Sequence, residues 1–138
     1  HVSFAYAEQK ILTDINLDIA KNESIAFVGE SGSGKTTLVN LITGLIPVQS
    51  GELTIDGLRI QDLDIKAYQA KIGYITQEPV IFSDTVFNNV TFWAEKNEVN
   101  LKRFWEALER AHIADFIRSL SDGEDSLLGN NGILVSGG

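Results

Sequence analysis

Residues 29 to 36 combine glycines, a lysine and a threonine in a spacing that suits the binding of phosphate. They read Gly-Glu-Ser-Gly-Ser-Gly-Lys-Thr and match the pattern G-x-x-x-x-G-K-[ST] at every fixed position. Glycines in such a loop let backbone N–H groups approach phosphate oxygens closely, because no side chain holds the anion away. The loop therefore predicts a site for a nucleoside triphosphate.

Each residue type in this phosphate loop has its own expected task. Lys35 would place its ammonium between the β- and γ-phosphates, and Thr36 would place its hydroxyl on Mg²⁺. The side chains of Ser31 and Ser33 are expected only to keep the loop soluble. Before nucleotide binds, we expect Lys35 to point at solvent. The predicted nucleotide-binding residues of the loop are Gly29, Glu30, Ser31, Gly32, Ser33, Gly34, Lys35, Thr36 and Thr37.

A strand before the loop and a helix after it must hold the loop in place. Residues 24–28 form a short apolar run that predicts a buried strand. Residues 37–42 have helical character, and Gly44 stands where a helix stop belongs. This order brings bare N–H groups and a helix N-terminus to one electropositive point.

The remaining sequence divides into a β-rich part, up to about Thr76, and a helical part. Alternating apolar residues and turn signals indicate strands, and helical spacing indicates helices. The further predicted strands are residues 2–6, 11–19, 52–55 and 72–75, and the further predicted helices are residues 62–70 and two or three segments from Thr85 onward.

Composition limits the partners that this chain can bind. The chain has 138 residues, a length that can bury one core, and a net charge of −8 with scattered basic residues. A nucleic-acid-binding surface needs clustered Lys and Arg, so we expect no nucleic acid partner. The absence of cysteine excludes disulfides and thiolate metal sites. No apolar stretch is long enough to cross a bilayer.

Together with the phosphate loop, five stretches make the chain resemble the ATPase domains of ABC transporters. Residues 135–138 read Val-Ser-Gly-Gly and resemble the signature sequence of that family. Residues 2–6 resemble its opening strand, and residues 72–79 resemble its strand and Q-loop. Residues 82–90 and 129–132 resemble segments of exporter-type domains, so the resemblance covers the whole chain.

The resemblance implies roles for residues outside the phosphate loop. Tyr6 would stack its ring on the adenine of ATP, although a strand aromatic packed on the core is the alternative. Gln77 would reach Mg²⁺ and the attacking water, although a solvated glutamine at a strand end is the alternative. The candidate catalytic residues would thus be Lys35 and Gln77, and the candidate metal ligands Thr36 and Gln77.

Partners and location follow from the same resemblance. Ser136, Gly137 and Gly138 would bind the γ-phosphate of an ATP that a second ATPase domain holds, so each ATP would lie between two domains, identical or different. A transmembrane domain in the same polypeptide would be the other partner. The domains would work at the cytoplasmic face of the inner membrane.

The implied fold class is α/β. It would comprise a P-loop NTPase-type core with an antiparallel β-subdomain over residues 1–84 and a helical subdomain over residues 85–138. In the family, an Asp-Glu strand (Walker B) and a switch histidine follow the signature, and the chain contains neither. We therefore expect an N-terminal fragment that cannot hydrolyse ATP alone. Its strands at 24–28 and 72–75 would lack central partners, so the sheet would close differently or pair with another copy.

Two functions from different classes follow from these observations. For the whole polypeptide we expect an exporter ATPase that couples ATP binding and hydrolysis to transport, and for the fragment alone a module that binds ATP without turnover. A non-transport ABC ATPase is the alternative, against which residues 82–90 and the acidic charge argue. A P-loop kinase fits less well because of Tyr6, Gln77 and the Ser-Gly-Gly end.

Overall fold

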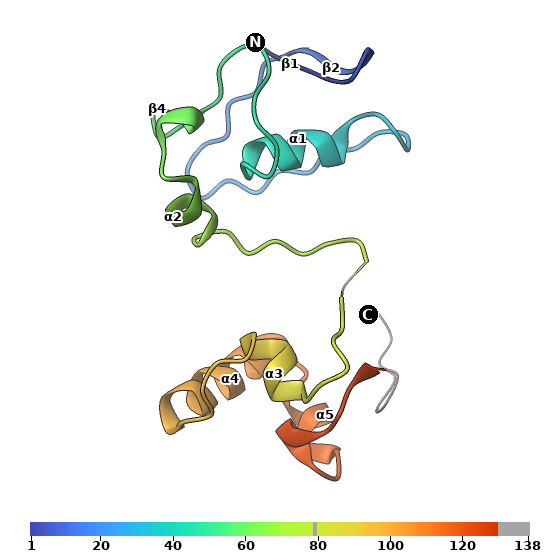
Figure 1. Cartoon of the computed structure of the whole chain (residues 1–138), viewed down its shortest axis with the longest axis vertical. Helices are drawn as coiled ribbons and strands as arrows, with labels where there is room; N and C mark the ends of the chain where they lie inside the picture. The colour runs from blue at the N-terminus through green and yellow to red at the C-terminus, as the bar shows by residue number, and fades with distance from the viewer. Residues whose placement is uncertain (79, 130–138) are drawn as a thin grey trace. The chain divides into compact units, whose positions relative to one another are not determined.

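The computed structural model describes residues 1–78 and 80–129, which fall into two compact units. Unit 1 spans His1–Tyr74 and holds the strands and the phosphate loop, while unit 2 begins at Ile75 and is helical (Figure 1). No helix among the described residues is long and apolar enough to cross a bilayer. The elements are β1 (Val2–Tyr6), β2 (Gln9–Ile15), α1 (Lys35–Ile42), β3 (Thr54–Ile55), β4 (Leu58–Arg59), η1 (Ile60–Asp62), α2 (Ile65–Gln69), α3 (Val86–Thr91), α4 (Glu98–Arg110), α5 (Ala114–Ser119) and η2 (Gly123–Asp125).

The core of unit 1 lies between the β1–β2 hairpin and α1. The two strands are antiparallel, and Phe4 lies opposite Leu12. Because alternate side chains of a strand face the same side, Val2 and Phe4 share one face and are both buried there. They pack in one cluster with Leu12 and with Leu41 of α1, which is fully buried. Burying a side chain of this size contributes about 1.5–3 kcal/mol, so this cluster holds α1 against the hairpin.

The predicted helix stop at Gly44 is confirmed in unit 1, because Gly44 follows α1 with a φ of 69°. Asn22 takes the left-handed conformation with a φ of 63°, which asparagine tolerates better than most residues. The prediction for residues 52–55 was incomplete, since the strand there is β3 and pairs with β4 across a turn at Asp56 and Gly57. The helix predicted over 62–70 is shorter, because the Asp64 side chain caps α2 by accepting from the N–H groups of residues 66 and 67.

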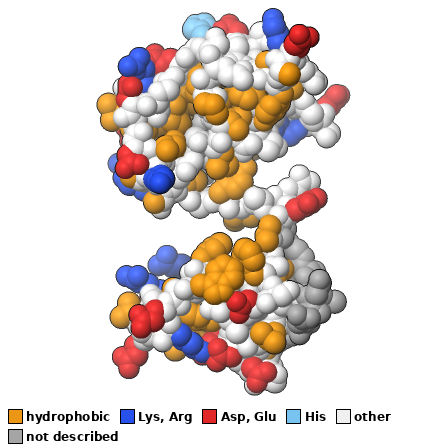
Figure 2. All heavy atoms as spheres, in the orientation of Figure 1, with side chains coloured by type: hydrophobic (Ala, Val, Ile, Leu, Met, Phe, Trp, Pro, Cys, Tyr) orange, Lys and Arg blue, Asp and Glu red, His pale blue; other side chains and the backbone are white. Residues whose placement is uncertain are grey.

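Two predicted strands are absent from the described residues, and both predictions were wrong. Residues 24–28 and 72–75 contain no strand, and Val28 and Ile75 are 92 % and 95 % exposed. The predicted alternation to residue 19 also stops early, because β2 ends at Ile15. A strand is stabilised by hydrogen bonds to its neighbours, and no neighbour among the described residues supplies them to these segments. Apolar side chains of these segments consequently remain exposed. Figure 2 shows hydrophobic side chains at the surface of both units.

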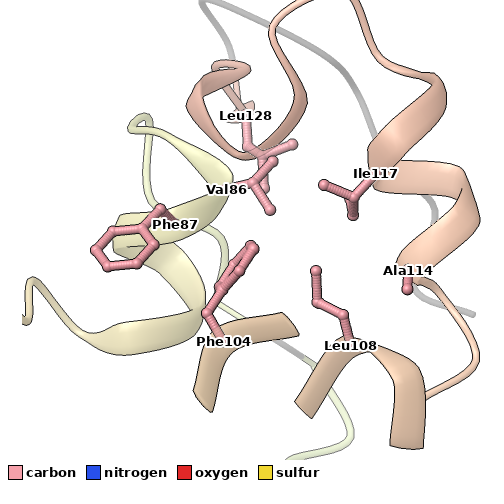
Figure 3. Close-up of a cluster of buried hydrophobic side chains, with 7 residues drawn as sticks. All are labelled: Val86, Phe87, Phe104, Leu108, Ala114, Ile117 and Leu128. Atoms are coloured by element: carbon pink, nitrogen blue, oxygen red, sulfur yellow. The ribbon is translucent and has the colours of Figure 1, made fainter. Parts of the chain in front are cut away.

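Unit 2 is a small helical body with its own core. The helices predicted after Thr85 are confirmed as α3, α4 and α5. Their apolar faces meet Leu128, which follows η2, in one cluster (Figure 3). The helix residues of this cluster are Val86, Phe87, Phe104, Leu108, Ala114 and Ile117. The rings of Phe87 and Phe104 lie 5.4 Å apart in a tilted arrangement. The 84–86 segment is joined to residues 126–128 by backbone hydrogen bonds, which close the end of the unit.

Asp84 organises the start of α3. Its carboxylate accepts hydrogen bonds from the side-chain amide of Asn88, from the N–H of Thr85 and from the indole N–H of Trp93. These bonds favour the charged form, so the Asn88 amide first, then the Thr85 N–H and the Trp93 indole, lower the pKa of Asp84. Trp93 has a φ of 59°, so its bond to Asp84 holds a strained left-handed residue in place.

Candidate functional site

The phosphate loop ends in an uncapped helix N-terminus. Gly32 and Gly34 have φ values of 81° and 94°, a conformation that glycine adopts without strain. Gly34 is the N-cap of α1, no side chain accepts a hydrogen bond from the first turn, and this turn contains no acidic residue. The first helical bond runs from the N–H of Leu38 to the carbonyl of Gly34. The N–H groups of residues 35–37 therefore have no acceptor within the helix and can donate to an anion.

Lys35 does not point at solvent, and that prediction was wrong. Its ammonium donates to the carbonyl oxygens of Gly29 at 2.8 Å and Glu30 at 2.6 Å, and to the hydroxyl of Ser33 at 3.3 Å. An ammonium has three donors, and the loop's own oxygens accept from all three. The side chain consequently curls over the loop, at the place where a phosphate would meet both the ammonium and the free N–H groups.

Gly34 fixes the loop against β2. A Cβ atom added at Gly34 would lie 2.7 Å from Cδ2 of Leu12 and 3.1 Å from Cγ2 of Ile11. A Cβ atom 2.7 Å from Cδ2 of Leu12 is closer than real Cβ atoms come, so any larger residue would force the buried Leu12 side chain to shift. The loop is therefore seated on the hairpin through the same Leu12 that lies in the core of unit 1.

Tyr6 lies at the end of β1 on the face that carries Phe4. Its ring meets that of Phe4 edge to face, with 4.9 Å between centroids, and the residue remains 50 % exposed. Phe4 lies opposite Leu12, and Leu12 is the residue that backs Gly34. This series of contacts connects a half-exposed aromatic ring with the phosphate loop inside one unit.

The residues at this site fit a magnesium ion bound together with a triphosphate. No group of three or more His, Cys, Asp or Glu side chains within residues 1–78 and 80–129 could hold a metal ion. In phosphate loops of this pattern a Ser or Thr hydroxyl binds Mg²⁺ together with the substrate phosphates, and the exposed Thr36 offers such a hydroxyl. Thr37 is only 8 % exposed, so we expect it to contribute through its backbone N–H.

The roles predicted for the other site residues are not tested by contacts among the described residues. Gln77 is exposed and belongs to unit 2, so its contacts with Mg²⁺ and water stay a prediction. Ser136, Gly137 and Gly138 lie outside the described residues. Glu30 and Ser31 are exposed, and the contacts predicted for them are untested.

Three residues that the sequence analysis did not single out help to build the site. Ile11 and Leu12 back Gly34, and the Gln49 side chain bonds to both backbone groups of Ala5, next to Tyr6. The alternating pattern of residues 11–19 marks the first two as strand residues but not as neighbours of the loop. No pattern in the sequence marks Gln49, because its side-chain amide bonds to the backbone of a residue that is distant in the sequence.

Comparison with known proteins gives one consistent family. The family model described as ABC transporter matches residues 12–135. The chain is 38 % identical over 137 residues to an ATP-dependent lipid A-core flippase of Francisella tularensis subsp. holarctica, covering 99 % of this chain and 22 % of the relative. It is 41 % identical over 138 residues to a protein of the same name from Desulfotalea psychrophila, covering 99 % of this chain and 24 % of the relative.

Solved structures agree with these relatives. A bacterial Atm1-family ABC exporter with ATP bound matches with a TM-score of 0.84 and 30 % identity, over 99 % of this chain and 24 % of that one. The α/β fold class predicted from the sequence is thereby confirmed as a portion of an ABC ATPase fold. The chain spans about a quarter of the length of the relatives that it matches.

Proposed function

The chain belongs to the ABC transporter family, and we propose that it is the ATP-binding part of an exporter's ATPase domain within a longer polypeptide. The observation that carries this proposal is the contact series from Tyr6 through Phe4 and Leu12 to Gly34, which joins a base platform to a phosphate loop. Many enzymes that bind a nucleoside triphosphate have a phosphate loop. The combination of the loop with an exposed aromatic ring favours ATP that is bound both through its phosphates and through its base.

Binding would exchange the loop's internal contacts for contacts to nucleotide. The ammonium of Lys35 leaves the carbonyl oxygens of Gly29 and Glu30 and bonds to the β- and γ-phosphates. The N–H groups at the start of α1 donate to the same anion, and Tyr6 carries the base. Thr36 and Gln77 would hold Mg²⁺, which supplies positive charge that stabilises the transferring phosphoryl group. The chemistry is thus positioning and charge stabilisation.

Hydrolysis and transport would need partners beyond this chain. We propose that Ser136, Gly137 and Gly138 complete the ATP site of a second ATPase domain, and that this domain completes the site described above. Transport would be carried out by a transmembrane domain, with the ATPase domains at the cytoplasmic face of the membrane. For this chain taken alone we propose binding of ATP.

The test is the affinity of full-length Lys35→Ala for Mg–ATP, measured by calorimetry. Charge-assisted hydrogen bonds contribute about 1.5–3 kcal/mol each, so losing the ammonium should weaken binding by about a hundredfold. Lys21→Ala is the matched control, because Lys21 is an exposed lysine of the same unit. The three bonds of Lys35 are exposed, and their loss should leave the fold intact. Unchanged ATP affinity in Lys35→Ala would overturn the assignment of the site.

A further inference from the structure

The outer edge of β1 is covered by residues 49–51, which we call the strap. The N–H of Ser3 donates to the carbonyl of Ser50 at 3.1 Å, and the two residues form an isolated antiparallel bridge. A Cβ atom added at Gly51 would lie 1.5 Å from the carbonyl oxygen of His1, so the strap lies directly against the strand. The strap therefore acts as a short third strand beside the hairpin.

Gln49 continues this pairing with its side chain. Its Oε1 accepts from the N–H of Ala5 at 2.9 Å, and its Nε2 donates to the carbonyl of Ala5 at 3.0 Å. A side-chain amide has the same donor and acceptor as a peptide group, so it can complete a strand edge like a backbone partner. Both backbone groups of Ala5 are thus paired with Gln49 of the strap, while Lys10 of β2 lies opposite Ala5 in the hairpin register.

The position of Ala5 decides the position of the base platform. Tyr6 is the next residue and the last of β1, and Ala7 after it turns with a φ of 51°. Its ring meets the edge of the Phe4 ring and is half exposed. A strand end supported this lightly would fray without a partner on its free edge.

We propose that Gln49 is a positioning residue that holds Tyr6 in the orientation needed to stack on the nucleotide base. The inference rests on the proposed function, because it assumes that Tyr6 carries the base of ATP. Gln49 itself does not touch the nucleotide in this proposal, and it acts through the backbone of Ala5. Its loss should thus weaken binding of ligands with a base and leave binding of the phosphate chain unchanged.

The structure suggests a substitution that removes the hydrogen bonds with little steric change. Gln49 lines an open cavity of about 210 Å³ between β1, β2 and the strap, and no residue of the phosphate loop lines it. Gln49→Met keeps a side chain of similar length there but has no amide. Gln61→Met is the matched control, because Gln61 is an exposed glutamine of η1 in the same unit.

The experiment measures the affinity of the full-length protein for Mg–ATP and for Mg–tripolyphosphate, which has the phosphates but no base. Tyr6→Ala should weaken ATP binding by about tenfold, the value of one aromatic stacking contact, and Gln49→Met by about threefold. Neither variant should change the affinity for tripolyphosphate. In the Tyr6→Ala background, Gln49→Met should have no further effect on ATP, because the ring it positions is gone.

Three results would overturn the inference. They are an unchanged ATP affinity in Gln49→Met, an equal fall for both ligands, or an undiminished effect of Gln49→Met in the Tyr6→Ala background. Failure of the proposed function gives a different result, namely that Lys35→Ala leaves ATP affinity unchanged. The two failures are therefore distinguishable on the same set of proteins.

Discussion

Two alanine substitutions, at Gly32 and at Gly34, test whether the close contact between Gly34 and β2 holds the phosphate loop in place. Gly32 and Gly34 both have a positive φ, of 81° and 94°, so alanine is strained at either position. They differ in their surroundings, because a Cβ at Gly34 would collide with Leu12 and Ile11, whereas a Cβ at Gly32 meets nothing within 4 Å. Gly32→Ala is therefore a control that measures only the cost of the left-handed backbone conformation.

The expected changes in the free energy of unfolding follow from two effects, the strain of the left-handed backbone and the overpacking against Leu12 and Ile11. Left-handed backbone costs a residue with a Cβ about 1–2 kcal/mol, and overpacking against a rigid core adds about 1–3 kcal/mol. Alanine also reduces the conformational entropy of the unfolded chain, which raises the free energy of unfolding of each variant by about 0.4–1 kcal/mol. We expect Gly32→Ala to lower the free energy of unfolding by about 1 kcal/mol and Gly34→Ala by about 3 kcal/mol.

Equilibrium urea unfolding of the full-length variants, followed by circular dichroism, measures this difference. Calorimetry with Mg–ATP adds a functional measure, since displacement of the loop from β2 moves the N–H donors at the start of α1. Gly34→Ala should therefore lose more ATP affinity than Gly32→Ala. Equal effects of the two substitutions on stability and on affinity would refute the role of the Leu12 contact.

Three further perturbations test other parts of the structure. The pKa of Asp84 is lower in the folded state than the ordinary carboxyl value of 3.8. The charged carboxylate therefore stabilises unit 2 fully at pH values above 3.8, and this stabilisation is lost as the pH falls through the lowered pKa. Asp84→Asn should flatten this acid dependence in unfolding curves, and an unchanged pH profile would contradict the network with Trp93. Gly51→Ala should detach the strap from His1 and increase hydrogen exchange in β1, and wild-type protection there would argue against the close contact. Phe104→Ala should lower the free energy of unfolding of unit 2 by about 3–5 kcal/mol, because the ring is 1 % exposed, and a loss below about 1 kcal/mol would show a loosely packed core.

The features predictable from the sequence were those that depend on neighbouring residues in the chain. Local conformational preferences and apolar spacing account for the helix after the phosphate loop, its stop at Gly44 and the helices after Thr85. The core helix face with Phe104 and Leu108 could also be predicted, because its side chains recur at helical intervals.

The features that could not be predicted depend on residues distant in the sequence. Residues 24–28 and 72–75 have the composition of strands, but a strand forms only where neighbours supply hydrogen bonds. The orientation of Lys35 depends on the curvature of its own loop, which brings the carbonyls of Gly29 and Glu30 to its ammonium. Gln49 resembles any turn glutamine in the sequence, since its partner Ala5 lies far along the chain.

The division into two units also separates the intrinsic fluorophores within these 138 residues. All three tyrosines, at positions 6, 68 and 74, belong to unit 1, whereas both tryptophans, at positions 93 and 105, belong to unit 2. Selective excitation of indole therefore reports on the helical half alone, and phenol emission originates only in the half that carries the phosphate loop. Melting of either half, or quenching of Tyr6 by a stacked base, can be observed optically without attaching a dye.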